Sequence, residues 1–158
     1  MKRSTKENIC NQIYNRKFKW FNDCVYCGEI ATDLDHVMPL DVVSKLDTTN
    51  EETINALGQG LSLVPSCSEC NRMAGAEPFD LIRDKGEYVQ NKIRKKYSKY
   101  LNQVHWEDWE IDELGPNMKK EVTRSLRLKK KTQSRITFPY GVKHEKILEQ
   151  WICRKRFW

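Results

Sequence analysis

The residues with the most specific chemistry lie between Cys24 and Asn71. Two Cys-x-x-Cys pairs, at residues 24–27 and 67–70, enclose the dipeptide Asp35-His36. Cysteine pairs at this spacing are typical of a tetrahedral zinc site, whereas a histidine beside a carboxylate suits acid–base chemistry close to a metal ion. The sequence therefore predicts a structural metal site next to a reactive one.

A single Cys-x-x-Cys pair is weak evidence, because the same spacing also serves redox chemistry. Two pairs in one short chain, with no apolar run of a secretory signal near the N-terminus, favour a zinc site in a reducing cytoplasm over disulfides. The other two cysteines, Cys10 and Cys153, are predicted to be small buried hydrophobes. The predicted structural zinc ligands are Cys24, Cys27, Cys67 and Cys70.

Asp35 and His36 could serve phosphodiester hydrolysis. A neutral histidine is the natural base near pH 7, and a divalent cation held by a carboxylate and an amide oxygen can stabilise the phosphoryl and leaving oxygens. Asn71 directly follows the last cysteine, so zinc would fix its position. Neighbours on a strand point to opposite faces, so Asp35 and His36 share a site only where the strand ends, and Pro39 favours such an end. Asp33 is a further candidate, as an extra ligand or as the group that orients His36.

The surrounding sequence predicts an α+β fold. Residues 30–38 alternate between apolar and polar and predict a strand, which is followed by a long loop over 41–60 with a short helix around 51–57. Residues 61–65 predict a second strand, and a helix is expected from Ser68 until Pro78 stops it. Such a unit buries little apolar surface, so a zinc staple suits it.

Helices are expected outside this unit. A capping-box pattern and apolar residues at helical spacing predict an amphipathic helix over residues 5–21. Long basic helices are predicted over 79–100 and 118–131, separated by an acidic and aromatic stretch at 105–114. A last helix is predicted over 143–153.

These elements predict an N-terminal helical arm (1–22), a zinc-stapled core (23–80) and a basic helical extension (81–158). The net charge of +6 suits a polyanion, with double-stranded DNA as the first candidate, and no membrane partner is expected. Lys and Arg contacts to phosphates give affinity that depends on salt more than on sequence. The residues predicted to contact nucleic acid are Arg72, Arg83, Lys92, Arg94, Lys95, Lys96, Arg124, Arg127, Lys129, Lys130 and Lys131.

Two segments resemble a known family. Asp-His-Val-Met-Pro-Leu at 35–40 and Leu-Val-Pro-Ser-Cys-Ser-Glu-Cys-Asn-Arg at 63–72 are similar to HNH endonucleases of the zinc-containing, ββα-metal type found in phages and bacteria. The resemblance covers residues 23–76. It implies that His36 is the general base, that Asp35 and Asn71 hold one Mg²⁺ or Mn²⁺ ion, and that the zinc is structural.

The sequence departs from this family at two positions. Ser62 stands where the family usually has the middle asparagine that ties the long loop down, so either Asn50 or Asn55 substitutes from the loop or the loop is looser. Ala74 stands where the family often has a lysine, which leaves a phosphate contact to Arg72 or Arg83. These changes bear on rate and metal affinity more than on reaction type.

The function expected from the sequence is metal-dependent cleavage of DNA, as a nick or as a double-strand cut. The alternative is a non-catalytic, zinc-stabilised DNA-binding module of a phage replication or packaging assembly. Asp35, His36 and Asn71 favour the nuclease, because a zinc scaffold has no need of that set. A nuclease toxin with an immunity partner is a third hypothesis. A single active site cuts one strand at a time. A double-strand break would therefore require a homodimer, a partner protein or two successive visits of one molecule to the same site.

Overall fold

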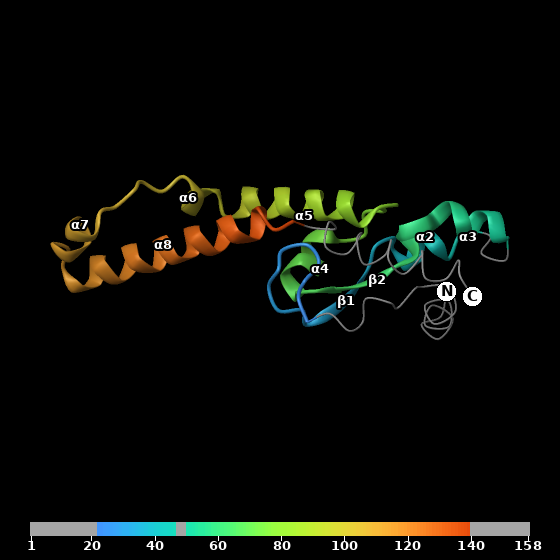
Figure 1. The fold of residues 1–158 in the computed structure, drawn as a ribbon, viewed down its shortest axis with the longest axis horizontal. Helices are drawn as coiled ribbons and strands as arrows, with labels where there is room; N and C mark the ends of the chain where they lie inside the picture. Colours follow the sequence, from blue (N-terminus) through green and yellow to red (C-terminus); the bar gives the residue numbers. More distant parts are fainter. Residues whose placement is uncertain (1–21, 47–49, 140–158) are drawn as a thin grey trace, which may run out of the picture.

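The computed structural model describes residues 22–46 and 50–139, and it is an α+β fold with a small sheet and an elongated helical arm (Figure 1). The helices predicted over 5–21 and 143–153 lie outside the described residues. The elements in chain order are β1 (Asp33–His36), α2 (Leu40–Val43), α3 (Glu51–Leu57), a 3₁₀ turn (Gly58–Leu61), β2 (Leu63–Ser66), α4 (Ser68–Ala74), α5 (Ile82–Lys96), α6 (Ser98–Leu101), α7 (Asp108–Asp112) and α8 (Pro116–Ile136).

The sheet consists of β1 and β2, which pair antiparallel with His36 opposite Leu63. The strand predicted over 30–38 was too long at both ends. Ile30 instead pairs with Asp23 in an isolated bridge that closes the first cysteine loop. Beyond His36 two more amide groups donate across to the turn before β2, and Pro39, which has no amide hydrogen, then caps α2.

One buried cluster joins the sheet, the cysteine loops and two helices. α4 contacts both β1 and α5, and the apolar face of α5 contributes Ile82, Val89 and Ile93 to the cluster. Tyr26 and Val64 are fully buried in it. The cysteine loops and α5, the first helix of the arm, therefore share a core.

A second, smaller cluster lies under α2 and α3, around Val43 and Leu57. The helix predicted around 51–57 is present as α3, and the side chain of Asn50 caps it by accepting a hydrogen bond from the Glu52 amide at 2.8 Å. This cap satisfies a helix-end amide that would otherwise lack a partner.

The arm consists of two helical segments that lie side by side, α5 with α6 in one and α8 in the other. The helix predicted over 79–100 is interrupted at Tyr97, where φ is −105° and ψ is 17°, and continues as the short helix α6. α8 begins at Pro116, an N-terminal position that suits proline, and runs back beside α6 and α5, while α7 lies at the end of the arm farthest from the sheet (Figure 1). None of the helices within the described ranges is long and apolar enough to cross a membrane.

Candidate metal centre and active site

The four predicted cysteines lie together. Their sulfur atoms are all within 4.8 Å of one another, and the Cys27 and Cys67 sulfurs are 3.8 Å apart. A tetrahedral zinc ion with Zn–S bonds of about 2.3 Å requires sulfurs separated by about 3.8 Å, so the cluster fits zinc. Within residues 22–46 and 50–139 it is the only group of three or more His, Cys, Asp or Glu side chains that could hold one ion.

Local backbone geometry shapes both cysteine loops. Gly28 has a φ of +73°, and a Cβ atom there would lie 2.5 Å from the ring of Phe138, so the turn after Cys27 needs a glycine. In the second loop Cys67 is the N-cap of α4, and its sulfur accepts a hydrogen bond from the Cys70 amide at 3.5 Å. The backbone of each loop therefore holds its two cysteines in a tight turn.

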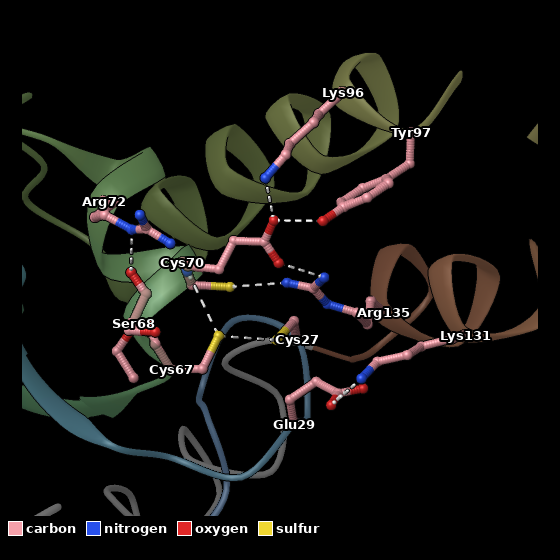
Figure 2. Close-up of polar contacts among 12 residues, drawn as sticks. Cys27, Glu29, Cys67, Ser68, Cys70, Arg72, Lys96, Tyr97, Lys131 and Arg135 are labelled. Carbon is pink, nitrogen blue, oxygen red and sulfur yellow. Dashed lines mark hydrogen bonds and ion pairs between the residues drawn. The ribbon is translucent and has the colours of Figure 1, made fainter. Parts of the chain in front are cut away.

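Glu69 and Arg135 connect the cysteine cluster to the arm, and Figure 2 shows Arg135 directed toward Cys70. Arg135, near the end of α8, is buried and donates to the Glu69 carboxylate at 2.7 Å and to the Cys70 sulfur at 3.8 Å. Lys96 and Tyr97 also donate to Glu69. Although burial alone would raise it, these three donors hold the pKa of Glu69 at about 2. The carboxylate is therefore a charged anchor for both arm helices.

Arg135 stays charged beside the thiols. Burial lowers its pKa, but Cys27 and the Glu69 carboxylate outweigh burial and raise the pKa above its ordinary value. Among the thiols, hydrogen bonds from the Cys24 and Cys27 sulfurs lower the pKa of Cys67. A cluster of four thiolates around zinc carries net negative charge, which a buried guanidinium compensates.

Asp35 is buried and already has two strong partners. Its Oδ2 atom accepts from the Tyr26 hydroxyl at 2.6 Å and lies 2.8 Å from the Lys85 ammonium. Lys85, on α5, is fully buried and also donates to the backbone carbonyls of His36 and Val37. This contact set ties the end of β1 to α5.

His36 is half-buried at the last position of β1. Burial lowers its pKa below 6.5, with Lys85 acting in the same direction and Asp35 opposing. The imidazole is therefore neutral at neutral pH. A neutral imidazole can accept a proton, which is what a general base requires.

The other predicted site residues lie on neighbouring elements. Asn71 is half-buried on α4, which contacts β1. Its backbone N–H donates to the Cys67 carbonyl. Ser62 is buried beside the end of β1, where its carbonyl accepts from the Val37 amide at 3.1 Å. Asp33 is exposed, and its carboxylate accepts from the Thr32 hydroxyl. Asn55 is exposed on α3.

The basic residues predicted to contact nucleic acid fall into two groups. Several are engaged within the protein: Arg72 with the Ser68 carbonyl, Arg83 with Asp84, Lys92 with the Met73 carbonyl, Arg94 with Asn91, Lys96 with Glu69, Lys129 with the Gln103 carbonyl, and Lys131 with Glu29. The rest have side chains that contact no other described residue through a hydrogen bond or ion pair, and they are Lys95, Arg124, Arg127 and Lys130.

Sequence reasoning missed Lys85 and Arg135. A signal for Lys85 exists, since it falls on the apolar face of α5 between Ile82 and Val89, where a lysine is out of place unless it is paired. No comparable signal exists for Arg135, whose partner Glu69 lies 66 residues away.

Comparisons of the chain with protein-family models, with curated proteins and with solved structures found no match.

Proposed function

We propose that this protein is a metal-dependent DNA endonuclease of the zinc-containing HNH type. The observation that carries the proposal is the end of β1, where the buried carboxylate of Asp35 and the half-buried side chain of His36 adjoin the helix α4, which bears Cys67 and Cys70 of the cysteine cluster. A structural zinc ion would be held by the four cysteines, and a zinc scaffold alone does not need that pair beside it.

His36 would take a proton from the attacking water. Asp35 and Asn71 would hold the divalent ion, which when bound supplies charge to stabilise the phosphoryl and leaving oxygens. Because Tyr26 and Lys85 both contact Oδ2 of Asp35, Oδ1 is the oxygen that remains for the ion. Mg²⁺ commonly uses only one or two carboxylates, with water completing its shell, so one oxygen from each of Asp35 and Asn71 suits it.

One observation favours the alternative, a non-catalytic zinc module that binds DNA. The Lys85 ammonium lies 2.8 Å from Oδ2 of Asp35, and a fixed positive charge at that distance opposes the binding of a second cation. In that case the basic arm would act alone and the protein would bind DNA without cutting it.

The test is cleavage of supercoiled plasmid by purified zinc-loaded protein with Mg²⁺ or Mn²⁺, and with EDTA after zinc retention is verified. Wild type should produce open-circle or linear DNA, and EDTA should stop it. His36→Ala should lower the rate by about 10²-fold or more while DNA binding is retained. The matched control is His105→Ala, since His105 is exposed on the distal arm, where it contacts Glu107. DNA binding without any product would support the non-catalytic module instead.

A further inference from the structure

Lys85 is a fully buried lysine, and each of the three hydrogens of its ammonium has an acceptor among the described residues. The acceptors are Oδ2 of Asp35 at 2.8 Å, the His36 carbonyl, and the Val37 carbonyl at 3.2 Å. These acceptors come from three consecutive residues at the end of β1. Burial lowers the pKa of Lys85 and the Asp35 carboxylate opposes that effect. A buried lysine is stable only when it is paired in this way.

The position of these contacts matters more than their number. Asp35 and His36 are neighbours, and on a regular strand their side chains point to opposite faces. Both can address one reacting centre only if the strand ends at a defined place and angle. Lys85 holds the carboxylate of the first residue and the backbone of the second, so one side chain fixes their relative position.

Tyr26 restrains the same carboxylate oxygen. Its hydroxyl donates to Oδ2 of Asp35 at 2.6 Å, and its own carbonyl accepts from the buried side chain of Gln90, five residues beyond Lys85 on α5. The first cysteine loop, β1 and α5 are therefore joined by polar contacts at the end of the strand.

We propose that Lys85 is a positioning residue for catalysis, which sets the orientation of the ligand Asp35 relative to the base His36. This inference rests on the proposed nuclease function. A lysine that serves stability alone would, when replaced, lower activity and metal binding together with the folded fraction. A positioning residue would, when replaced, lower the catalytic rate even where metal is fully bound.

The experiment compares wild type, Lys85→Met and Lys45→Met as zinc-loaded full chains. Lys45 is exposed after α2 and lies outside the site, so its substitution is the matched control for removing one lysine. Mn²⁺ binding is measured by electron paramagnetic resonance without DNA, and kcat for plasmid cleavage is measured over a Mn²⁺ titration. Circular dichroism reports the folded fraction.

Lys85→Met should bind Mn²⁺ at least as tightly as wild type, because a positive charge beside the ligand has been removed. Its kcat at saturating Mn²⁺ should fall by as much as about 100-fold, the order expected for a misplaced reacting group. Lys45→Met should match wild type in both measurements. A folded Lys85→Met protein with wild-type kcat would overturn the inference and leave the nuclease proposal intact.

If Lys85→Met does not fold, the variant Tyr26→Phe tests whether restraint of the Asp35 carboxylate matters for catalysis. It removes one hydrogen bond to the same carboxylate oxygen and keeps the buried ring, so kcat should fall severalfold with Mn²⁺ binding unchanged. An unchanged kcat in Tyr26→Phe would overturn the inference in that case. A wild-type protein that neither binds Mn²⁺ nor cleaves DNA would overturn the nuclease proposal, and this inference with it.

Discussion

His36 combines partial burial with a lowered pKa. Burial is the main cause and the nearby Lys85 ammonium adds to it, so the imidazole loses its proton at lower pH than a histidine in water. This property suits a base that must be unprotonated under physiological conditions, and it has a consequence for the pH dependence of cleavage.

The rate of cleavage at saturating Mn²⁺ should be constant around neutral pH and should fall only in acid. A base works when neutral, and the neutral fraction is lost as pH falls through the folded-state pKa. The midpoint of the acid limb should therefore lie below pH 6.5. Zinc content must be followed in parallel, because acid also protonates thiolate ligands. A midpoint above pH 6.5 with zinc retained would contradict the role given to His36.

At the scale of elements, α8 is tied to the cysteine cluster by its last turn. Arg135 contacts Glu69 and Cys70, and Lys131, one turn earlier, pairs with Glu29 in the first cysteine loop at 2.8 Å (Figure 2). The cysteine cluster and the arm are thus in direct contact, and each should stabilise the other.

Arg135→Gln should weaken zinc binding. The guanidinium is buried beside the thiols, and partners outside the ligand shell typically contribute about 10- to 100-fold to metal affinity. Competition with a chromophoric chelator measures the zinc dissociation constant. Lys130→Gln is the control on the same helix, since that side chain is exposed. Equal zinc affinity in the two variants would show that Arg135 serves only the packing of α8.

The same helix carries a stripe of exposed basic side chains, Lys120, Arg124 and Arg127, which we call the α8 stripe. Their spacing of four and three residues places them on one face of the helix, opposite the buried Val122. Lys131 continues this face towards the first cysteine loop. The α8 stripe is thus directed away from the helices packed behind α8 and is available to phosphates.

Replacing the three residues of the α8 stripe by alanine should reduce the salt dependence of DNA binding. Each lost phosphate contact lowers the slope of log affinity against log salt by about 1, so a change of about 3 is expected. The control replaces Lys45, Lys119 and Lys129, which removes equal charge but takes one exposed lysine of the core and two lysines that already contact Asp112 and the Gln103 carbonyl. Equal slopes for the two triple variants would contradict the assignment of this face to DNA.

The elements were predictable where single residues end them. Pro39 lies directly after the last amide that bonds across to the turn before β2, although β1 itself ends three residues earlier at His36, and Gly75 with a φ of +62° ends α4 close to where Pro78 was expected to stop it. The cysteine cluster was also predictable, because the Cys-x-x-Cys spacing within each pair is visible in the sequence. The break at Tyr97 was not predictable, since no proline or glycine marks it. The end of α8 at Ile136 does have a signal, Pro139 three residues beyond it, and the prediction that stopped this helix at residue 131 ended it too early.

The contacts that assemble the site were not predictable for a different reason. Lys85 and Arg135 read as solvated charges, which is the ordinary state of such residues. Their partners Asp35 and Glu69 lie about 50 and 66 positions away, and only the packing of α5 and α8 on the core brings them together. Lys96 and Lys131, which were predicted to contact DNA, likewise pair with carboxylates far away in the sequence, on Glu69 and Glu29.

At the scale of the whole molecule, one compact unit and one long arm share a core. The end of β1 lies in the compact unit and the α8 stripe on the arm (Figure 1). Phosphate contacts on the arm would give affinity with little sequence preference, while the core would provide the chemistry. The acidic helix α7, at the far end of the arm, would be repelled by the same phosphates and marks where such a contact surface stops.

The proposed nuclease depends on Asp35 holding a catalytic cation next to His36. The most direct test measures Mn²⁺ binding and plasmid cleavage on the same zinc-loaded samples of wild type, Asp35→Asn and Asp80→Asn, the last being an exposed carboxylate before α5. Wild type and Asp80→Asn should bind one Mn²⁺ per chain and cleave, whereas Asp35→Asn should lose both properties and keep its zinc. Wild-type Mn²⁺ binding and cleavage by folded Asp35→Asn would contradict this role of Asp35.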